Sequence, residues 1–498
     1  MSKIKTYSIQ TFWCAMNFSD TEKIATVLDS YWLEEISDDK NADLVIFNTC
    51  SIKQKSEDKI FWFLNNFKKI KEKFPHRKYA ITWCMVKTTW TRDPNKNKEE
   101  NEKLKFYSND PLLRRDKTLD FVFRILDLPI VPEILWLDKN NKSSEEGNNK
   151  ISEDKKKFFQ IKQKLKSPHQ AIIPIQTGCD NFCTYCVVPY TRWREYSRSI
   201  EEISREIKFY WKKWVKEIIL VGQNVNSYWK WWWITKRKFD EENKKWLDSE
   251  NWNEDEKTPF AKLLIELDKI AQENWIERIR FQSSNPHDIT DDIIEAILNC
   301  KTIMPALHFA LQSWNDEILK KMKRRHTYQD FKKIVEKLRN SDWFWKKYGK
   351  RFWISTDLIV WFSWETEEQF QNTIRAIQEI EFDMIYISQY SVRKWTFAWD
   401  NFPDDVSLEV KKRRWQDANE ELKKSMQKRM DFFKWQKVKV LIDKIITWKK
   451  SENWEIIEEC EWKTEENYVC RFLNKNYKIW EIVEVEVIWN DTWALKWT

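Results

Sequence analysis

The chain has 498 residues, 42% hydrophobic and 33% charged, and these values predict a soluble protein of several domains. Its formal net charge of +8 is only mildly basic for this length, so it is compatible with an RNA partner without proving one. No stretch is long and apolar enough to span a membrane, and the charged N-terminal segment predicts a first strand, not a signal peptide. We therefore expect a cytoplasmic protein.

Glycine and tryptophan occur in abnormal numbers. The chain has 4 glycines and 33 tryptophans, whereas average usage would give about 35 glycines in a chain of this length. Many tryptophans stand in polar loops and turns, as in "IVWFSWET" (359–366), where glycine is favoured because it tolerates a positive φ. We hypothesise that most of them are glycine in the protein as its own cell makes it. That cell would read the codon UGA as glycine, whereas the printed sequence translates it as tryptophan. The alternative is a truly tryptophan-rich protein.

Three regions follow one another along the chain. Residues 1–138 alternate strands, at 5–12, 42–49 and 78–83, with helical spacing, and predict a three-layer α/β domain. Residues 139–167 are a polar, lysine-rich linker. Residues 168–432 and 433–498 predict two further domains.

The central region, 168–432, alternates strand and helix candidates. The strand candidates are residues 171–176, 217–222, 278–283, 306–311, 353–362 and 384–390. Ser199 is the expected N-cap of the first intervening helix, and residues 405–432 predict a charged helix. Six βα units predict a partial, TIM-like (β/α)6 barrel. Residues 433–498 carry short alternating strands and predict a small β-barrel.

Cys179, Cys183 and Cys186 follow the first predicted barrel strand with the spacing C-x3-C-x2-C. The carboxyl ends of barrel strands carry active sites. Four-iron clusters normally take four thiolates, so three would leave one iron open to a small molecule. The spacing differs from that of ferredoxins and zinc ribbons. Buried cysteines without a metal are the alternative.

This motif resembles that of the radical S-adenosylmethionine (SAM) enzymes. The resemblance implies a [4Fe-4S] cluster held by Cys179, Cys183 and Cys186, whose open iron is chelated by SAM. In that superfamily, reductive cleavage of SAM gives a radical that abstracts hydrogen from an unactivated carbon.

A second set consists of Cys14, Cys50 and Cys84, each directly after one of the three N-terminal strands. If these strands are parallel neighbours, the three thiolates converge at one edge of the sheet. From the residues alone, three core cysteines are an equal alternative. The set resembles the N-terminal domain of the methylthiotransferases, and the resemblance implies a second, auxiliary [4Fe-4S] cluster that handles sulfur. Cys300, Cys460 and Cys470 match no motif and are predicted to be structural.

The resemblance covers essentially the whole chain. "NTCSIK", "LVGQNVNSY" and "LHFALQSW" are similar to the branch of the family that acts on N6-isopentenyladenosine in tRNA. Several tryptophans stand where the family has glycine: Trp13, Trp83, Trp193, Trp314, Trp361, Trp364 and Trp395. These departures support the glycine hypothesis.

Further residues are candidates for cofactor or substrate contacts. The resemblance places Tyr185 near the cofactor adenine, with plain packing as the alternative. Gln223 and Gln312 end barrel strands and are candidates for hydrogen bonds to cofactor or substrate, or for a structural role. Arg192, Arg194 and Arg198 are candidates for binding the cofactor carboxylate or RNA phosphate, or for a solvated charged face.

The C-terminal β-barrel resembles the TRAM domain, an RNA-binding module. The whole resemblance implies a tRNA methylthiotransferase acting beside the anticodon, with two [4Fe-4S] clusters and SAM, an electron donor such as flavodoxin or ferredoxin, and a monomeric state. The alternatives are the same chemistry on threonylcarbamoyl-adenosine tRNA or a ribosomal protein, and a noncatalytic iron–sulfur or zinc RNA-binding protein.

Overall fold

The structure is a computed structural model. It describes residues 4–12, 14–49, 54–83, 86, 110–135, 156–192, 194–229, 238–240, 245–247, 257–339, 352–394, 396–449, 456–490 and 494–496. The chain divides into two compact units. Unit 1 contains Met1–Lys166, Thr177–Tyr196 and Arg393–Asp400, and unit 2 contains Ser167–Gln176, Ser197–Val392 and Asn401–Thr498.

Unit 1 is built on a parallel sheet. Its strands are β1 (Thr6–Thr11), β2 (Glu34–Glu35), β3 (Leu44–Thr49), β4 (Lys78–Trp83) and β5 (Phe121–Phe123), in the spatial order β2-β1-β3-β4-β5. Its helices include α1 (Ala15–Ser30), α2 (Gln54–Lys73), α4 (Pro111–Arg115), η1 (Ile125–Ile130), α5 (Val131–Ile134) and α7 (Val188–Thr191). The three strands expected from the sequence are confirmed, as is their parallel arrangement.

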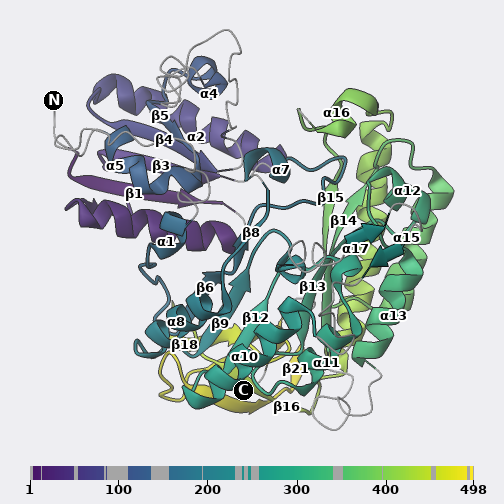
Figure 1. Cartoon of the computed structure of the whole chain (residues 1–498). Coiled ribbons are helices and arrows are strands. Elements are labelled where there is room, and N and C mark those ends of the chain that lie inside the picture. The colour runs from purple at the N-terminus through teal and green to yellow at the C-terminus, as the bar shows by residue number, and fades with distance from the viewer. Residues whose placement is uncertain are drawn as a thin grey trace. The chain divides into compact units, whose positions relative to one another are not determined.

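Helices cover both faces of this sheet (Figure 1). Val45 and Phe47 of β3 belong to one hydrophobic cluster with Ile60 and Leu64 of α2. On β1, the Tyr7 hydroxyl donates a hydrogen bond to Asp29 Oδ1 of α1 at 2.6 Å. Since side chains alternate between the two faces of a strand, the sheet packs against α2 on one face and α1 on the other. The expected three-layer α/β domain is confirmed.

The end of the expected linker packs on α1. Lys23 Nζ donates to the backbone oxygens of Phe158 and Ile161, at 3.2 and 2.9 Å. The backbone amide of Lys166 donates to Glu22 Oε1 at 2.9 Å. Residues 156–166 therefore belong to the packed structure of unit 1, while the boundary at residue 167 stays a prediction.

Unit 2 contains an open arc of parallel strands in chain order. These are β6 (Gln170–Pro174), β9 (Glu217–Val221), β12 (Arg278–Phe281), β13 (Ala306–Gln312), β14 (Trp353–Val360) and β15 (Met384–Gln389). The six strands form two three-stranded sheets, β6-β9-β12 and β13-β14-β15. Two backbone hydrogen bonds of Ser284 join these sheets: its amide donates to the His308 oxygen at 3.2 Å, and its oxygen accepts from the Ala310 amide at 2.8 Å. The expected partial barrel is confirmed.

Helices cover the outer face of this arc. They are α8 (Ile200–Trp211), α10 (Pro259–Glu273), α11 (Asp291–Asn299), α12 (Asp316–Lys321), α13 (Tyr328–Arg339), α15 (Glu367–Ile380) and α17 (Leu408–Asp431). Ser199 caps α8 as expected, since its hydroxyl accepts from the Glu202 amide while the Glu202 carboxylate accepts from the Ser199 amide. Phe309 of β13 meets Phe331 of α13 edge-on. The alternate residue His308 therefore belongs to the inner face of the arc.

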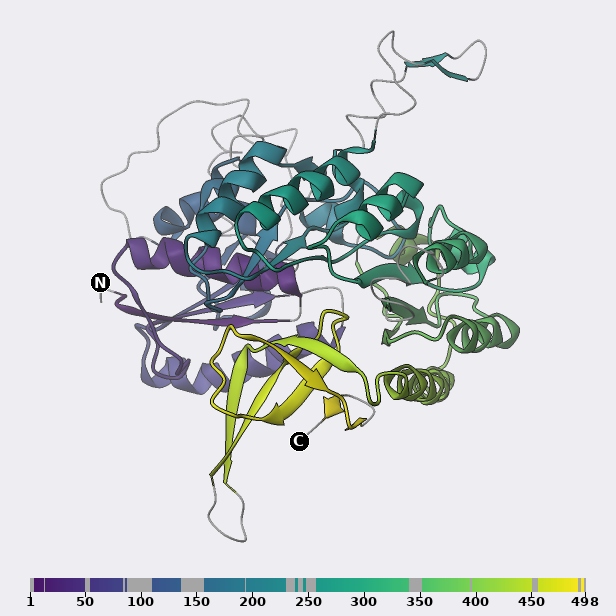
Figure 2. The same ribbon diagram turned by 90° about the horizontal axis from the view of Figure 1, so that it is seen from below.

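The C-terminal strands form a small β-barrel, yellow in Figure 2. They are β16 (Lys437–Leu441), β17 (Lys444–Lys449), β18 (Ile456–Lys463), β19 (Val469–Leu473), β20 (Ile482–Glu486), β21 (Trp489–Asn490) and β22 (Leu495–Lys496). Strand β16 pairs with β20, and β17-β18-β19-β22-β21 form a second sheet. The Arg278 guanidinium of β12 donates to the backbone oxygens of Lys463 and Lys439, at 2.9 and 3.0 Å. These bonds fix the small barrel to the arc within unit 2.

The remaining short elements are β7 (Gln176–Thr177), β8 (Tyr196–Ser197), η2 (Val225–Ser227), β10 (Lys238–Asp240), β11 (Lys245–Leu247), η3 (Pro286–Asp288) and α16 (Phe397–Asn401). Among the described residues, no helix has the length and hydropathy needed to cross a membrane.

Candidate active site

The N-terminal cysteine set (Cys14, Cys50 and Cys84) follows three neighbouring parallel strands. Strand β3 lies between β1 and β4, with Thr11 paired to Asn48 and Thr49 paired to Trp83. The chain therefore leaves all three strands at the same edge of the sheet. Cys14 is the N-cap of α1, whereas Cys50 and Cys84 lie outside the described residues. The parallel arrangement is confirmed, and the convergence of the three thiols stays a prediction.

Asn17 fastens this edge together. Its side-chain amide donates to the backbone oxygens of Phe12 and Thr49, at 2.6 and 3.1 Å, and its Oδ1 accepts from Cys14 Sγ at 3.3 Å. The Thr49 hydroxyl in turn donates to the Thr82 oxygen at 2.8 Å. Polar bonds thus connect the ends of β1, β3 and β4 immediately before the three cysteine positions.

The loop cysteine set (Cys179, Cys183 and Cys186) lies on one short, tightly turned segment. Gly178 and Phe182 have φ values of 82° and 45°, and the Cys186 amide donates to the Cys183 oxygen at 3.0 Å. All three cysteines are half-buried, and none of them forms a disulfide with another described residue. Burial raises the pKa of the Cys179 thiol above its ordinary value, and the nearby Cys186 and Cys183 raise it further. The three sulfurs are therefore close enough to influence one another.

Neighbouring groups hold this loop in place. Asp180 Oδ1 accepts from the backbone amide of Glu195 at 3.4 Å and forms an ion pair with Arg194 Nε at 2.8 Å. The backbone oxygen of Thr184 accepts from the Ala398 amide at 2.8 Å. The loop is anchored on both sides of Cys183, which favours a defined ligand geometry.

The three candidate arginines have different environments. Arg192 and Arg198 are buried and form ion pairs with Asp20 and Glu206. These two do not belong to a solvated charged face, because their guanidinium groups are committed inside the protein. The side chain of Arg194 is 67% exposed beyond its pair with Asp180, as a solvated charge would be.

The remaining candidates lie at strand ends or in the loop. Tyr185 is half-buried beside Cys186, and Gln223 is half-buried directly after β9. Gln312 ends β13 with a φ of 77°, and Ser283, just after β12, has a φ of 71°. Non-glycine residues in this region are strained, and such strain is concentrated at functional sites. Contacts of Gln223 and Gln312 with cofactor or substrate stay a prediction.

A polar cluster on the inner face of the arc was not expected from the sequence. His308 Nδ1 lies 2.9 Å from Ser355 Oγ, and His308 Nε2 lies 3.0 Å from Asp357 Oδ2. The Tyr386 ring meets the His308 ring edge-on. The signal was present, since these residues interrupt apolar strands at every second position, but pairing them requires the strand register.

The loops after β9 and β12 carry a second overlooked network. Asn224 Nδ2 donates to Asp288 Oδ2 at 2.6 Å, and Asn226 Nδ2 donates to the Asn285 oxygen at 2.7 Å. Asn226 Oδ1 accepts from the Asn285 amide at 2.9 Å. These bonds join the "QNVNSY" and "SSNPHD" loops at the carboxyl edge. Polar residues directly after strands were the available signal.

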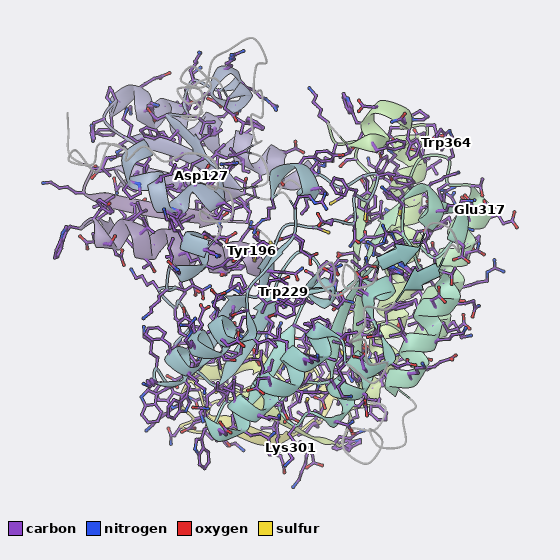
Figure 3. All side chains as sticks on the ribbon, viewed as in Figure 1. Asp127, Tyr196, Trp229, Lys301, Glu317 and Trp364 are labelled. Carbon is purple, nitrogen blue, oxygen red and sulfur yellow. The ribbon has the colours of Figure 1, made fainter. Side chains whose placement is uncertain are left out.

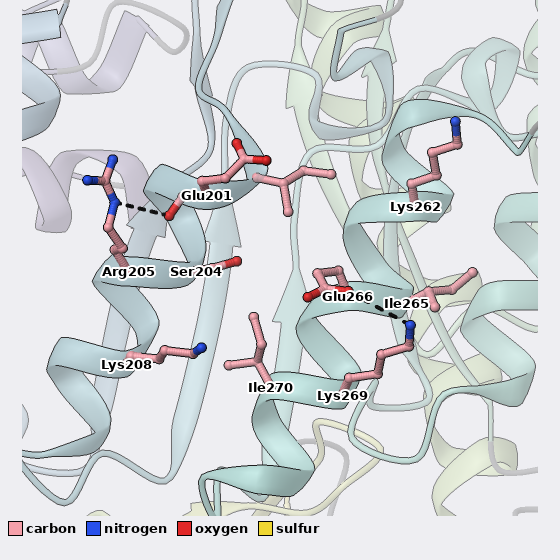
Figure 4. Close-up of a pocket in the computed structure, with 10 residues that line it drawn as sticks. Glu201, Ser204, Arg205, Lys208, Lys262, Ile265, Glu266, Lys269 and Ile270 are labelled. Atoms are coloured by element: carbon pink, nitrogen blue, oxygen red, sulfur yellow. Dashed lines mark hydrogen bonds and ion pairs between the residues drawn. The ribbon is translucent and has the colours of Figure 1, made fainter.

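A separate hollow lies between α8 and α10 (Figure 4). It has a volume of about 610 Å³ and is lined by side chains such as Ser204, Lys208 and Ile270. None of the candidate site residues lines it, so it is not part of the proposed chemistry.

Comparison with known proteins identifies the family. Residues 173–377 match the Radical SAM superfamily, and residues 6–104 match the Uncharacterized protein family UPF0004. A Clostridium botulinum protein named tRNA-2-methylthio-N(6)-dimethylallyladenosine synthase is 32% identical over 489 residues, covering 98% of this chain and 96% of that protein. The chain belongs to this family. It is thus a transferase of the radical SAM methylthiotransferase type.

A second relative agrees with this assignment. A Clostridium tetani protein of the same name is 31% identical over 443 residues, covering 88% of this chain and 85% of its own length. A solved structure of the radical S-adenosylmethionine methyltransferase TsrM from Kitasatospora setae aligns with a TM-score of 0.45 and 12% identity, covering 80% of this chain and 77% of that one.

Membership implies a [4Fe-4S] cluster and SAM as cofactors. The loop cysteine set fits such a cluster by donor type and by its spacing along the chain. As they stand, no three Cys, His, Asp or Glu side chains of the described residues are already in a metal-binding arrangement. Metal binding must therefore displace the thiol protons and draw the sulfurs together.

Proposed function

We propose that this family member replaces the C2 hydrogen of N6-isopentenyladenosine, next to the tRNA anticodon, with a methylthio group. Two findings support the proposal together: a complete loop cysteine set, and an N-terminal sheet whose β1, β3 and β4 end side by side just before Cys14, Cys50 and Cys84. Relatives covering nearly the whole chain carry the corresponding name. A noncatalytic metal site would have little use for two sets of three ligands.

The two cysteine sets would divide the work. Cys179, Cys183 and Cys186 would hold the radical-generating cluster, and Cys14, Cys50 and Cys84 a second cluster for the sulfur. A three-thiolate cluster supplies an open iron, which at the loop set would take SAM. Asp180 keeps the loop set in its turn through its two bonds, and Asn17 keeps the ends of β1 and β3 together.

The C-terminal β-barrel is the candidate for tRNA binding, as its likeness to the TRAM domain implies. Arg278 and Arg280 hold it rigidly on the arc: the Arg280 guanidinium bonds the backbone oxygens of Glu465 and Thr464, at 2.9 and 2.7 Å. A target base in an anticodon loop must leave its stack, at a cost of a few kcal/mol. We further propose a cytoplasmic monomer reduced by a flavodoxin or ferredoxin.

Nucleoside mass spectrometry tests the function directly. The chain is expressed in a bacterial host that lacks its own enzyme, and the tRNA is digested and analysed. We expect the 2-methylthio derivative of isopentenyladenosine to appear only with the gene. A methylthio derivative of threonylcarbamoyladenosine, with isopentenyladenosine unchanged, would overturn the substrate assignment.

A further inference from the structure

A buried ion pair joins α1 to the loop cysteine segment inside unit 1. Arg192 Nη2 lies 2.5 Å from Asp20 Oδ2, and the two side chains are 2% and 0% exposed. Arg192 Nη1 also donates to Thr177 Oγ1 at 3.3 Å. Thr177 leads into the loop cysteine set and Arg192 caps the helix after it, so one guanidinium holds both ends of the loop and ties them to α1.

The same face of α1 contacts Cys14 and the strand ends that precede the N-terminal cysteine set. Asn17, Asp20 and Thr21 are all buried and share one helix face, because residues three and four apart are neighbours on a helix. Asn17 bonds the ends of β1 and β3, and Thr21 Oγ1 accepts from Asn48 Nδ2 at 2.9 Å. The core-facing side of a helix is ordinarily apolar. The hydrophobic effect therefore does not explain why this side of α1 carries buried polar residues.

Stability does not explain the pair either. Desolvation of two charges offsets much of their attraction, and well-packed apolar residues often stabilise a core equally well. A buried pair does fix direction, because an arginine fork accepts only a narrow range of carboxylate positions. Compared with apolar packing, the ion pair therefore adds a fixed orientation of the loop cysteine segment relative to α1.

We propose that Asp20 and Arg192 are positioning residues for methylthio transfer, which hold the loop cysteine set at a fixed separation from the N-terminal cysteine set. The proposal rests on the function proposed above. In that reaction the substrate carbon must meet the sulfur after losing its hydrogen, and a displacement of about 1 Å can cost about 100-fold in rate. A variant with a weakened ion pair should therefore still cleave SAM but form less methylthiolated tRNA.

The test compares Asp20→Asn and Arg192→Lys with the reconstituted wild-type enzyme. We expect SAM cleavage per bound iron to stay near the wild-type value while methylthiolated tRNA falls about tenfold, so cleavage events per product rise about tenfold. The exchanged pair, Asp20→Arg with Arg192→Asp, should regain part of the coupling if it folds. Pulsed electron paramagnetic resonance of the reduced protein should show a broader range of separations between the two clusters in the single variants.

Arg429→Lys is the matched control. Arg429 of α17 forms a buried pair with Asp383 at 2.7 Å, far in sequence from both cysteine sets. It should lower the melting temperature without changing cleavage events per product. Equal losses of cleavage and product in Asp20→Asn and Arg192→Lys, or an unchanged ratio, would overturn the positioning role while leaving the proposed function intact. An inactive wild-type enzyme would overturn both.

A different observation carries a second inference, about the tryptophans. Among the described residues, fifteen that are not glycine have a positive φ. Eight of these are tryptophan: Trp32, Trp214, Trp229, Trp275, Trp361, Trp364, Trp435 and Trp480. A bulky residue is a genuine outlier in this region, whereas glycine adopts it freely. Figure 3 labels two of them, Trp229 and Trp364.

Four of the eight stand just after helix ends. Trp32, Trp214, Trp275 and Trp435 follow α1, α8, α10 and α17 and are 94%, 83%, 74% and 69% exposed. Backbone bonds close three of these ends: Leu33 to Leu28, Val215 to Tyr210 and Ile276 to Ala271. This is the Schellman pattern, whose left-handed position is usually glycine. An exposed indole contributes nothing to that pattern.

Trp361 shows the same mismatch in the core. It is fully buried after β14 with a φ of 70°, and no hydrogen-bond partner for its indole Nε1 is found among the described residues. A buried indole N–H normally finds a partner. Its backbone amide donates to Glu365 Oε2 at 2.7 Å, a bond that glycine would keep.

We infer that these eight positions are glycine in the protein as its own cell makes it, through reading of UGA as glycine. Glycine at position 361 would also remove an indole from the carboxyl edge of the arc, where barrels bind their ligands. The gene should carry UGA at all eight codons, and peptides from the native protein should have the masses of glycine. UGG at most of these codons would overturn the inference.

Synthetic genes test the physical reason separately. Glycine at the eight positions should raise solubility and melting temperature over the printed sequence. Alanine at the same positions is the matched control, since it removes the indole but still resists a positive φ. We expect the alanine version to melt below the glycine version. Equal melting of the two would contradict a backbone requirement for glycine.

Discussion

The two cysteine sets are assembled by different means. Cys179, Cys183 and Cys186 lie on one loop, and its turn is made locally by the positive φ of Gly178 and Phe182. Cys14, Cys50 and Cys84 are far apart in sequence and depend on β1, β3 and β4 lying side by side. A site built by a loop depends on a few residues, whereas a site built by a sheet depends on the packing of a whole domain.

This difference has consequences for both sites. Damage to the N-terminal sheet should affect the N-terminal set first, because its ligands have no shared local segment. The loop set should be affected less, provided that its anchors at Asp180, Thr184 and Arg192 remain. The largest effects should come from removing single ligands of either set.

Cys183→Ala should have the largest effect on the chemistry. It removes a ligand of the radical-generating cluster, so SAM cleavage should fall by more than about 100-fold, a loss larger than that caused by removing a ligand's supporting partner. Cleavage is measured as 5′-deoxyadenosine formed anaerobically with a reductant. Cys300→Ala, at a buried cysteine outside both sets, is the control and should retain cleavage. Cleavage at the wild-type rate in Cys183→Ala would remove the loop set from the mechanism.

Cys50→Ala sharpens the contrast between the sets. Methylthiolated tRNA should disappear, while SAM cleavage per iron should stay within about twofold of wild type, because the loop set is intact. Both products are quantified from the same reaction. Full product formation would mean that the N-terminal cysteines are structural.

Asn17→Ala probes the support of the N-terminal set without removing a ligand. Loss of its bonds to Phe12 and Thr49 leaves buried carbonyls unsatisfied and should destabilise unit 1 by about 1–3 kcal/mol. Iron bound by the N-terminal set should fall, with little change at the loop set. Asn274→Ala, which removes a single bond to the Ile270 oxygen, should leave iron content unchanged. Equal iron loss from both sets would mean that they are not built independently.

Glu22 on α1 gives the smallest effect, a dependence of stability on pH. Burial raises the pKa of its carboxyl from 4.5 to about 7, so the folded state binds a proton that the unfolded state releases between these values. The free energy of unfolding should therefore fall as pH rises from about 4.5 to 7, by on the order of 1–3 kcal/mol.

Glu22→Gln should remove this dependence, because the glutamine amide does not titrate. Its oxygen can still accept the hydrogen bond from the Lys166 amide, so the local structure is kept. Melting curves at pH 5 and pH 8 would show wild type losing stability relative to the variant at the higher pH. A parallel pH dependence of the two proteins would mean that Glu22 does not titrate in this range.

The sequence predicted what local patterns determine. Strand alternation placed β1, β3 and β4, the capping residue Ser199 placed the start of α8, and cysteine spacing identified the loop set. It did not predict the pairing of Asp20 with Arg192, nor that of His308 with Asp357. Such contacts depend on strand register and on packing between distant segments, which no local period encodes.

The tryptophans also show what the sequence alone could not predict. Composition alone indicated that glycine was missing, but not at which positions the backbone requires it. The left-handed φ at Trp32, Trp214 and Trp275 supplies that answer, because it follows from how each helix ends.

The iron content of three proteins tests the central claim most directly. These are the anaerobically reconstituted wild type, the variant with Cys14, Cys50 and Cys84 all changed to alanine, and the variant with Cys179, Cys183 and Cys186 all changed to alanine. Two independent four-iron clusters predict about eight irons per wild-type chain and about four in each variant. About four irons in the wild type, or loss of all iron in either variant, would contradict the account.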